Sequence, residues 1–223
     1  MIVSASRRTD IPAFYAEWFY NRLVENYLYV RNPMNPKQVS ELKLSRDTVD
    51  CFVFWTKNPG PMMDRLSILE TMGYPYYFQF TLTAYGQDME PGLPDKRELV
   101  ETFRTLSRRI GAERVIWRYD PILLGGIYNV EYHCRWFEQL RKSLSGYTQT
   151  CVISFIDMYA RIKKSMEHMG VYDMGAGDIR LLASLLGPIA KQYKIGLQTC
   201  SEAMDLSEYG IQKGKCIDEQ MFL

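Results

Sequence analysis

The sequence predicts an α/β fold, a TIM-type barrel of partial or irregular form with parallel strands inside and helices outside. Short runs rich in β-branched and aromatic residues alternate with helical stretches along the 223 residues. Several runs are apolar on both faces, which is typical of buried strands in a parallel sheet. No Gly-x-Gly-x-x-Gly or Walker motif follows any run, and this disfavours the alternative fold, an open doubly wound sheet that binds nucleotides.

Seven strand-like runs supply the predicted β elements. They cover residues 2–6, 27–31, 51–56, 76–83, 114–119, 151–156 and 195–199. The run CFVFWT, for example, has no charged residue, as expected for a strand that is buried on both sides. A further alternating segment at 39–45 follows the sequence NPMNP and predicts an excursion or hairpin after the second strand.

Helices are predicted between these strands, at 12–25, 61–72, 95–110, 129–145 and 178–193. Pro94 precedes the third helix and Gly111 is its expected end, since proline suits a first turn and glycine a C-terminal cap. Asp178 is the expected N-cap of the last helix. Pro188 predicts a kink within the same helix.

Composition and charge limit the classes of protein that fit. The chain has 27 Lys and Arg against 26 Asp and Glu, a formal net charge of +1 that argues against strong non-specific binding to nucleic acid. Its longest apolar runs are strand-sized, and MIVSASRRTD lacks the apolar core of a signal peptide. We therefore expect a cytoplasmic protein with no membrane partner. It is expected to be a single domain over 1–223, with 203–223 as a C-terminal extension.

Polar residues follow six of the predicted strands. The sequences are SASRRTD, FWTKNP, QFTLTAYG, WRYDP, SFIDMY and LQTCSE. In parallel α/β folds the C-terminal ends of the strands form the active-site face. Because loops are polar in most proteins, one such end carries little weight, but the repetition over six strands favours a shared polar pocket.

The predicted residues for binding a substrate or anion have charged or amide side chains at these strand ends: Arg7, Arg8, Asp10, Lys57, Asn58, Arg118, Gln198 and Glu202. Arg7 and Arg8 suit a phosphate or carboxylate. Asp10 could hold one of these guanidinium groups, or it could equally cap the next helix. Arg118 lies two residues before Asp120 in RVIWRYDP, on the same side of a strand. The alternative for this pair is a structural ion pair.

The predicted catalytic residues are Asp120, Asp157 and Cys200. The two carboxylates end strands, where they could orient groups or move protons. Cys200 could be a reactive thiol or a metal ligand, and an inert thiol is an equal alternative. Cys200 and Cys216 together are a weak candidate metal pair. The five cysteines include no C-x-x-C and argue for a reducing compartment, while His133 and His168 lie away from strand ends, which disfavours a histidine triad.

Long motifs resemble a bacterial family known only as domain of unknown function number 1848. They are SASRRTDIPAFYAEWF, RNPMNPKQVS, FWTKNP, YYFQFTLTAYG, VIWRYDPILL, CVISFID and LQTCSE, and the likeness runs from Met1 to about Asp218. TKNP and RYDPI also resemble, more distantly, segments of radical S-adenosylmethionine enzymes of the spore photoproduct lyase type. That second resemblance implies a partial or full TIM-type barrel, a [4Fe-4S] cluster held by three cysteines, and S-adenosylmethionine as cofactor.

The chain departs from the family pattern near its C-terminal end. Family members typically continue into a cysteine-rich tail with a C-x-x-G-C-x-Y-C-like run, whereas this sequence ends in CIDEQMFL. Thiolate ligation of a [4Fe-4S] cluster needs closely spaced cysteines, so the sequence as given lacks a complete cluster site. We expect either a truncated form or a member that has lost the cluster.

Three functions remain open at this point. The first is an enzyme of radical S-adenosylmethionine type, a lyase or transferase, in which the basic residues hold an anionic substrate or the carboxylate of the cofactor. The second is a cluster-free TIM-barrel enzyme that acts on a phosphorylated or carboxylated small molecule. The third is a nucleic-acid-binding module, which the net charge disfavours. The expected partner is therefore a small or nucleotide-like anion.

Overall fold

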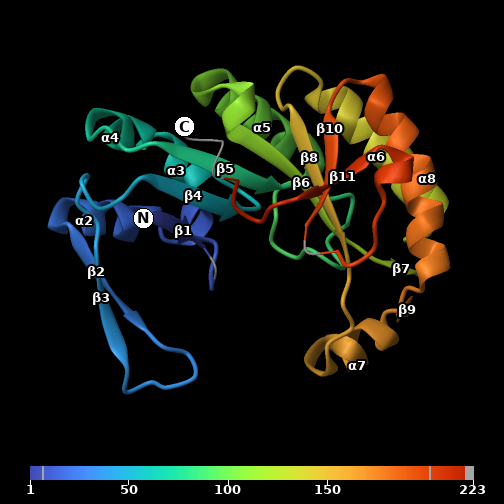
Figure 1. Cartoon of the computed structure of the whole chain (residues 1–223), viewed down its shortest axis with the longest axis horizontal. Coiled ribbons are helices and arrows are strands. Elements are labelled where there is room, and N and C mark those ends of the chain that lie inside the picture. Colours follow the sequence, from blue (N-terminus) through green and yellow to red (C-terminus); the bar gives the residue numbers. More distant parts are fainter. Residues whose placement is uncertain (7, 201, 219–223) are drawn as a thin grey trace. The chain divides into compact units, whose positions relative to one another are not determined.

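A computed structural model describes residues 1–6, 8–200 and 202–218 of the chain (Figure 1). The fold is mixed α/β, with seven parallel strands and flanking helices. The chain divides into two compact units, Met1–Phe80 and Thr81–Asp218. The single domain expected over 1–223 stays a prediction. No helix in the described part of the chain is both long and apolar enough to cross a membrane.

The first unit contains three parallel strands and a separate hairpin. The parallel strands, in spatial order, are β1 (Ile2–Ala5), β4 (Cys51–Thr56) and β5 (Tyr76–Thr81). The helices are α1 (Ile11–Phe14), α2 (Ala16–Glu25), α3 (Gly60–Met63) and α4 (Leu66–Thr71). Phe19 of α2 packs edge-on against Phe52 and Phe54 of β4, with ring centroids 5.3 and 5.2 Å apart. Aromatic packing of α2 on β4 therefore forms the core of this unit.

The predicted strand 27–31 exists but does not belong to the parallel sheet. It forms β2 (Tyr27–Arg31), which pairs antiparallel with β3 (Val39–Lys43) in a two-stranded sheet of its own. The hairpin predicted around 39–45 is thus confirmed. Tyr29 and Val30 of β2 are exposed, so this run lacks the two buried faces that a central parallel strand needs.

The second unit holds four parallel strands. In spatial order they are β6 (Val115–Ile122), β8 (Thr150–Phe155), β10 (Gly196–Cys200) and β11 (Ile211–Gly214). A short antiparallel pair joins β7 (Leu124–Gly125) to β9 (Val171–Tyr172). The helices are α5 (Lys96–Ile110), α6 (Val130–Leu144), α7 (Ala160–His168) and α8 (Ala176–Gln192), with 3-10 turns at Ala112–Arg114 and Ser207–Tyr209.

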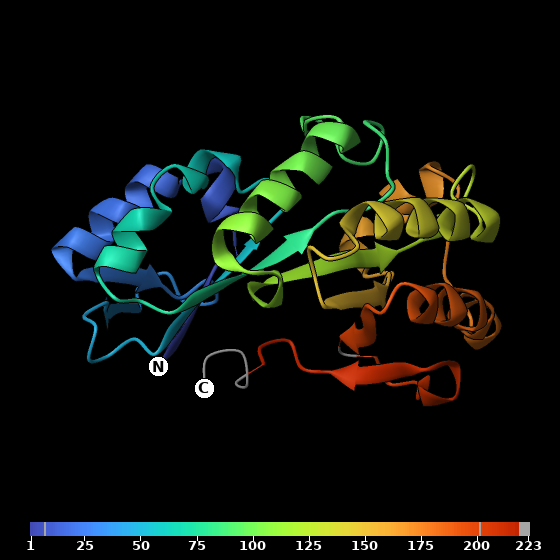
Figure 2. The ribbon, with the colours of Figure 1, turned by 90° about the horizontal axis from the view of Figure 1, so that it is seen from above.

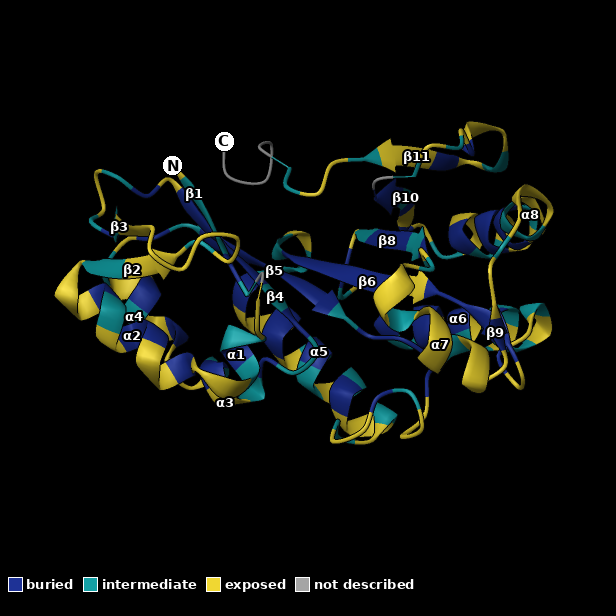
Figure 3. Cartoon of the chain, turned by 90° about the horizontal axis from the view of Figure 1, so that it is seen from below, coloured by how far each residue is buried: buried dark blue, intermediate teal, exposed yellow. Residues whose placement is uncertain are grey.

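Helices α5 and α6 lie side by side along one face of β6 (Figure 2). Trp117 of β6 stacks on Phe137 of α6, with ring centroids 5.1 Å apart. Most of β6 is buried (Figure 3). The buried strand and the helices on it form the core of the second unit, and this core fixes the direction in which the polar residues of β6 point.

Helix ends follow the sequence with three differences, one of which is that the predicted helix 61–72 is divided into α3 and α4. Asp95 caps α5 by accepting hydrogen bonds from two backbone N–H groups, and Gly111 ends this helix at a φ of 99°. The predicted helix 12–25 is divided at Tyr15 into α1 and α2. Asp178 is not the N-cap of α8, because the helix begins two residues earlier. Its side chain instead accepts a hydrogen bond from the N–H of Gly175, the capping residue, at 3.0 Å.

The predicted closed barrel is not found. Within the described residues, β1 pairs only with β4 and β11 pairs only with β10, so each leaves one edge of its sheet free. One predicted strand is lost to the β2–β3 hairpin, and β11 comes from the segment expected as an extension. Seven parallel strands remain, one short of the eight with which a TIM barrel closes. The parallel sheet is therefore open.

Candidate functional site

Neighbouring strands of the second unit place polar side chains in two rows on one face. The register aligns Arg118 of β6 with Val152 of β8, and Val152 with Gln198 of β10. Aligned residues of parallel strands point to the same face, and so do residues two positions apart along a strand. Ser154 and Cys200 therefore form the next row on β8 and β10. The register of β6 shifts between Tyr119 and Ile122, and Asp120 belongs to this row through its contact with Ser154.

Arg118 and Asp120 form a buried, two-pronged ion pair. The guanidinium donates from Nε to Oδ1 at 2.9 Å and from Nη2 to Oδ2 at 2.5 Å. The hydroxyl of Ser154 lies 3.4 Å from the same Oδ2. Burial by itself would lower the pKa of Arg118, but Asp120 and then Cys200 raise this pKa above its ordinary value. Arg118 therefore stays charged, and the fork fixes the direction of both groups.

The backbone that follows Asp120 is held by Tyr85. The Asp120–Pro121 peptide bond is cis. The Tyr85 hydroxyl donates to the carbonyl of Pro121 at 2.7 Å and accepts from the N–H of Leu123 at 3.0 Å. Burial raises the pKa of Tyr85 far above its ordinary value, so the hydroxyl keeps its proton. Tyr85 therefore positions the strand end that carries the ion pair.

Two cysteine thiols meet at the ends of β10 and β11. Parallel pairing sets Cys200 opposite Gly214, and Cys216 follows two residues later. The two Sγ atoms are 3.0 Å apart. Cys200 is buried and Cys216 is exposed. A Cβ on Gly214 would lie 2.9 Å from the carbonyl oxygen of Thr199, so glycine at this position allows the two strands to approach.

Glu202 and Asp157 lie near each other, just past the C-terminal ends of β10 and β8. Glu202 accepts a hydrogen bond from the N–H of Phe155 at 2.9 Å. Burial raises the pKa of Glu202, and the charge of Asp157 adds to this increase. Asp157 itself is exposed and accepts from the hydroxyl of Tyr159 at 3.0 Å. The structure therefore places Asp157 at an exposed position, while its predicted catalytic role stays a prediction.

The remaining predicted site residues belong to the first unit, where Asp10, Lys57 and Asn58 take part in hydrogen bonds. Asp10 caps α1 by accepting from the N–H of Ala13 at 3.0 Å, and its other oxygen accepts from the N–H of Lys57 at 2.7 Å. Asn58 accepts from the N–H of Gly60 at 3.1 Å. These contacts match the capping alternative considered for Asp10.

Arg8 is exposed, and Arg7 lies outside the described residues. Because the predicted pocket combined residues of both units, the idea of one shared pocket stays a prediction.

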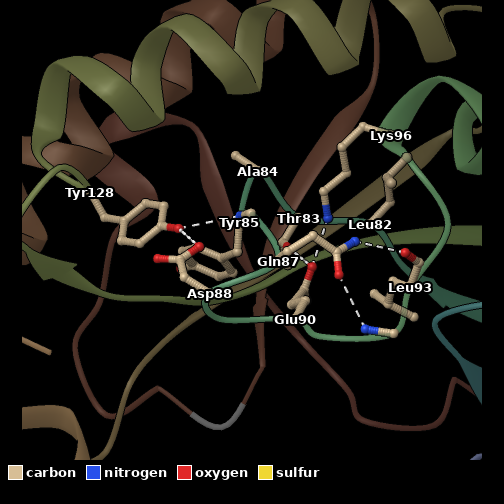
Figure 4. Close-up of polar contacts among 12 residues, drawn as sticks. Leu82, Thr83, Ala84, Tyr85, Gln87, Asp88, Glu90, Leu93, Lys96 and Tyr128 are labelled. Carbon is tan, nitrogen blue, oxygen red and sulfur yellow. Dashed lines mark hydrogen bonds and ion pairs between the residues drawn. The ribbon is translucent and has the colours of Figure 1, made fainter.

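Sequence reasoning missed a network of hydrogen bonds in the loop after β5 (Figure 4). Glu90 is buried and accepts from the hydroxyl of Thr83 at 2.8 Å and from Nζ of Lys96 at 2.7 Å. The hydroxyl of Tyr128 donates to Asp88 at 2.6 Å. The segment QFTLTAYG marks the start of this loop, but nothing in it points to partners elsewhere in the chain.

Ser154 and His133 were also not predicted as parts of a network. Ser154 could have been found from the two-residue period of β8. His133 is buried, and its Nε2 lies 2.8 Å from the carbonyl of Leu123 while Nδ1 lies 2.9 Å from the Tyr119 hydroxyl. Burial lowers the pKa of His133 to about 4. The ring is therefore neutral, with the Nε2 proton donated to Leu123, and its role is structural.

Comparison with known proteins gives a match to one family model. No curated protein and no solved structure matches the chain. The more distant resemblance to radical S-adenosylmethionine enzymes stays a prediction. A family model described as Domain of unknown function (DUF1848) matches residues 2–223. Since this match spans nearly the whole sequence, the chain belongs to the DUF1848 family.

Proposed function

We propose that the protein is an enzyme that performs thiol–disulfide exchange with the Cys200–Cys216 pair. The observation that carries the proposal is the 3.0 Å distance between the two Sγ atoms. A disulfide bond needs about 2.05 Å, so the thiols have to approach by only about 1 Å. The exposed Cys216 can meet a substrate, and the buried Cys200 lies directly behind it.

The distance favours a disulfide over a shared metal ion. Two thiolates on one tetrahedral Zn²⁺, with bonds of about 2.3 Å, would lie about 3.8 Å apart. The pair is already closer than this. Among the described residues, no group of three or more His, Cys, Asp or Glu could hold a metal ion.

The charge around Cys200 supports the same chemistry. The Arg118 guanidinium interacts with the Cys200 side chain. A nearby positive charge favours the thiolate, which is the nucleophile in thiol exchange. Asp120 contributes indirectly, because its carboxylate fixes the direction of the guanidinium.

The proposed exchange balances without a cofactor. The Cys216 thiolate attacks one sulfur of a substrate disulfide, the substrate S–S bond breaks, and the first substrate thiolate leaves and takes up a proton. The Cys200 thiolate then attacks Sγ of Cys216 in the mixed disulfide and releases the second substrate thiolate. Two electrons pass from the protein dithiol to the substrate, and a Cys200–Cys216 disulfide remains.

The second candidate function is the radical S-adenosylmethionine enzyme suggested by resemblance, and the observation in its favour is that two thiols, those of Cys200 and Cys216, lie together. A [4Fe-4S] cluster of that type needs three thiolates, and the described residues bring together two. Cys51 and Cys151 are buried in other strands, and Cys134 is on α6. The residues present do not fit a complete cluster.

Oxidised glutathione is a suitable model disulfide for the test. We expect each reduced protein molecule to convert one glutathione disulfide to two glutathione thiols, and peptide mapping to find Cys200 joined to Cys216. Cys216→Ser should abolish the reaction, whereas Cys134→Ser, which changes a thiol on α6, should leave it intact. Failure of the reduced protein to form the Cys200–Cys216 bond at any glutathione ratio would overturn the proposal. Stable visible absorbance after anaerobic addition of iron and sulfide, lost in Cys216→Ser, would instead support the cluster.

A further inference from the structure

The first unit contains a hollow beside β1 that none of the functions above uses. Its volume is about 410 Å³, within the range of about 300–1,000 Å³ found for small-molecule sites. Five elements contribute to the walls: β1 with the turn that follows it, the start of α1, helix α2 and the two hairpin strands β2 and β3. The hollow lies within the first unit, so its shape does not depend on the second.

Apolar and aromatic side chains dominate the walls. Trp18 of α2 and Tyr29 and Val30 of β2 line the hollow, and all three are exposed. Exposed aromatic groups around a concave surface are typical of sites that bind a flat apolar body.

The charge of the lining has one sign. Arg8 and Arg31 line the hollow, and among the described residues no Asp or Glu does; the nearby Glu41 carboxylate interacts with the hydroxyl of Tyr29. Nη1 of Arg31 donates to the carbonyl of Pro36 at 3.1 Å, which holds the side chain but leaves its other donors available. Among the described residues, the Arg8 side chain has no ion pair. Two guanidinium groups without a lining carboxylate favour an anion.

Two serine hydroxyls in the lining also favour an acceptor ligand. Ser4 Oγ accepts a hydrogen bond from the Trp55 indole N–H at 3.0 Å. Ser6 Oγ accepts from the N–H of Ile11 at 3.2 Å. Because these oxygens already accept, each hydroxyl proton is available for donation to a ligand oxygen.

Ser6 also adopts an unusual backbone conformation, with a φ of 100°. A residue other than glycine in this region is strained, and such strain is concentrated at functional sites.

We infer that this hollow binds a small amphipathic anion, in which a carboxylate, phosphate or sulfonate is joined to a flat apolar body. The apolar body lies against Trp18 and Tyr29. The anionic group accepts hydrogen bonds from Arg8, Arg31 and the serine hydroxyls. The hollow and the thiol pair share no residue, so the two proposals can fail independently.

A matched pair of fluorescent probes tests this site. 8-Anilinonaphthalene-1-sulfonate carries the anionic group, and N-phenyl-1-naphthylamine has the same apolar body without it. We expect the sulfonate to bind at one site per chain and at least fivefold more tightly than the neutral probe. Arg8→Ala and Arg31→Ala should each remove most of the preference for the sulfonate over the neutral probe. Trp18→Ala should weaken the binding of both probes.

The controls distinguish probe binding in the hollow from nonspecific probe binding elsewhere on the protein. Arg65→Ala removes another exposed arginine of the same unit that does not line the hollow, and it should leave both affinities unchanged. Cys200→Ser should also have no effect. Equal affinity for the two probes overturns the proposal, and so does sulfonate binding that survives Arg8→Ala and Arg31→Ala in variants that melt cooperatively. Ser6→Ala, which makes no change in charge, should lower the sulfonate affinity alone.

Discussion

Asp120 accepts two hydrogen bonds from the guanidinium of Arg118, the residue two positions before it on β6. The side chains are 6% and 13% exposed, for Arg118 and Asp120 respectively, so both charges lie largely out of water. A buried ion of this kind is stable only while its partner is present. The strand therefore ends in a rigid charged fork directed toward Cys200.

Removal of the carboxylate should destabilise the protein strongly. Asp120→Asn leaves the buried Arg118 charge without its counterion, and the loss of one partner of such a pair costs about 3–5 kcal/mol. Urea unfolding followed by circular dichroism measures this change. Glu101→Gln is the control, since Glu101 pairs with Arg108 at 2.9 Å and both side chains are exposed. A midpoint for Asp120→Asn as close to wild type as that of the control would contradict the buried pair.

Loss of the Tyr85 hydroxyl should also destabilise the second unit. Tyr85→Phe removes both the acceptor for the Leu123 N–H and the donor to the Pro121 carbonyl. An unsatisfied buried polar group costs about 1–3 kcal/mol. Tyr159→Phe removes a hydroxyl that bonds to Asp157 at an exposed position, and its unfolding midpoint should stay near wild type. If Tyr85→Phe and Tyr159→Phe have the same unfolding midpoint, Tyr85 does not hold the strand end.

Local patterns predicted the parts of the site that lie close together in sequence. The two-residue period of a strand placed Arg118 and Asp120 on one side, and their contact needs no information about the rest of the fold. The excursion or hairpin at 39–45 was predicted from the same alternation, but its pairing with β2 was not. The capping alternative for Asp10 was accessible because a cap bonds to a residue two or three positions later, whereas Asp178 was wrongly placed as a cap.

Contacts between distant segments were not predictable from the sequence. Strand β11 has a polar sequence, IQKG, and it becomes a strand only by pairing with β10. The meeting of Cys200 with Cys216 depends on that pairing. Tyr85 is 36 positions from Pro121, and no periodic pattern links them. The barrel prediction failed similarly, because the pairing of edge strands decides whether a sheet closes.

His133 should make stability depend on pH. Its pKa is about 4 in the folded protein, against about 6.5 when unfolded. Between these values the unfolded chain binds a proton that the folded chain does not, so stability is complete above about pH 6.5 and falls as the pH decreases toward 4. The loss attributable to this ring reaches about 3 kcal/mol.

The comparison of two histidine variants isolates this contribution. The sequence has two histidines, and His168 is exposed on α7. His133→Gln should reduce the dependence of unfolding free energy on pH between about 4 and 6.5, whereas His168→Gln should retain it. Equal slopes for wild type and His133→Gln would show that the ring does not titrate in this way.

The ion pair of Lys96 with Glu90 should control the mobility of the loop after β5. Glu90 is 5% exposed and Lys96 is 20% exposed, with 2.7 Å between Nζ and Oε2. Lys96→Ala removes this counterion from a buried carboxylate, so we expect faster amide exchange in residues 83–95, by about tenfold if the local stability falls by about 1.4 kcal/mol. Mass spectrometry of deuterium uptake measures this exchange rate. Lys163→Ala, from an exposed pair on α7, should not change exchange in this loop.

Gly214 should set how quickly Cys200 and Cys216 react with each other. In Gly214→Ala the new Cβ would lie 2.9 Å from the carbonyl oxygen of Thr199, so β11 has to move away from β10. Because the strand carries Cys216, a shift of this kind should slow formation of the Cys200–Cys216 bond by about tenfold, as poor alignment of reacting groups does in general. The rate is measured with oxidised glutathione and acid quenching.

Gly177→Ala is the matched control for that substitution. Its Cβ would have open space, and it lies in α8, where alanine is preferred over glycine. The oxidation rate of this variant should equal that of wild type, and its melting temperature should be no lower. Oxidation of Gly214→Ala at the wild-type rate would mean that the close approach of β10 and β11 does not position the thiols. The 3.0 Å distance would then not explain their reactivity.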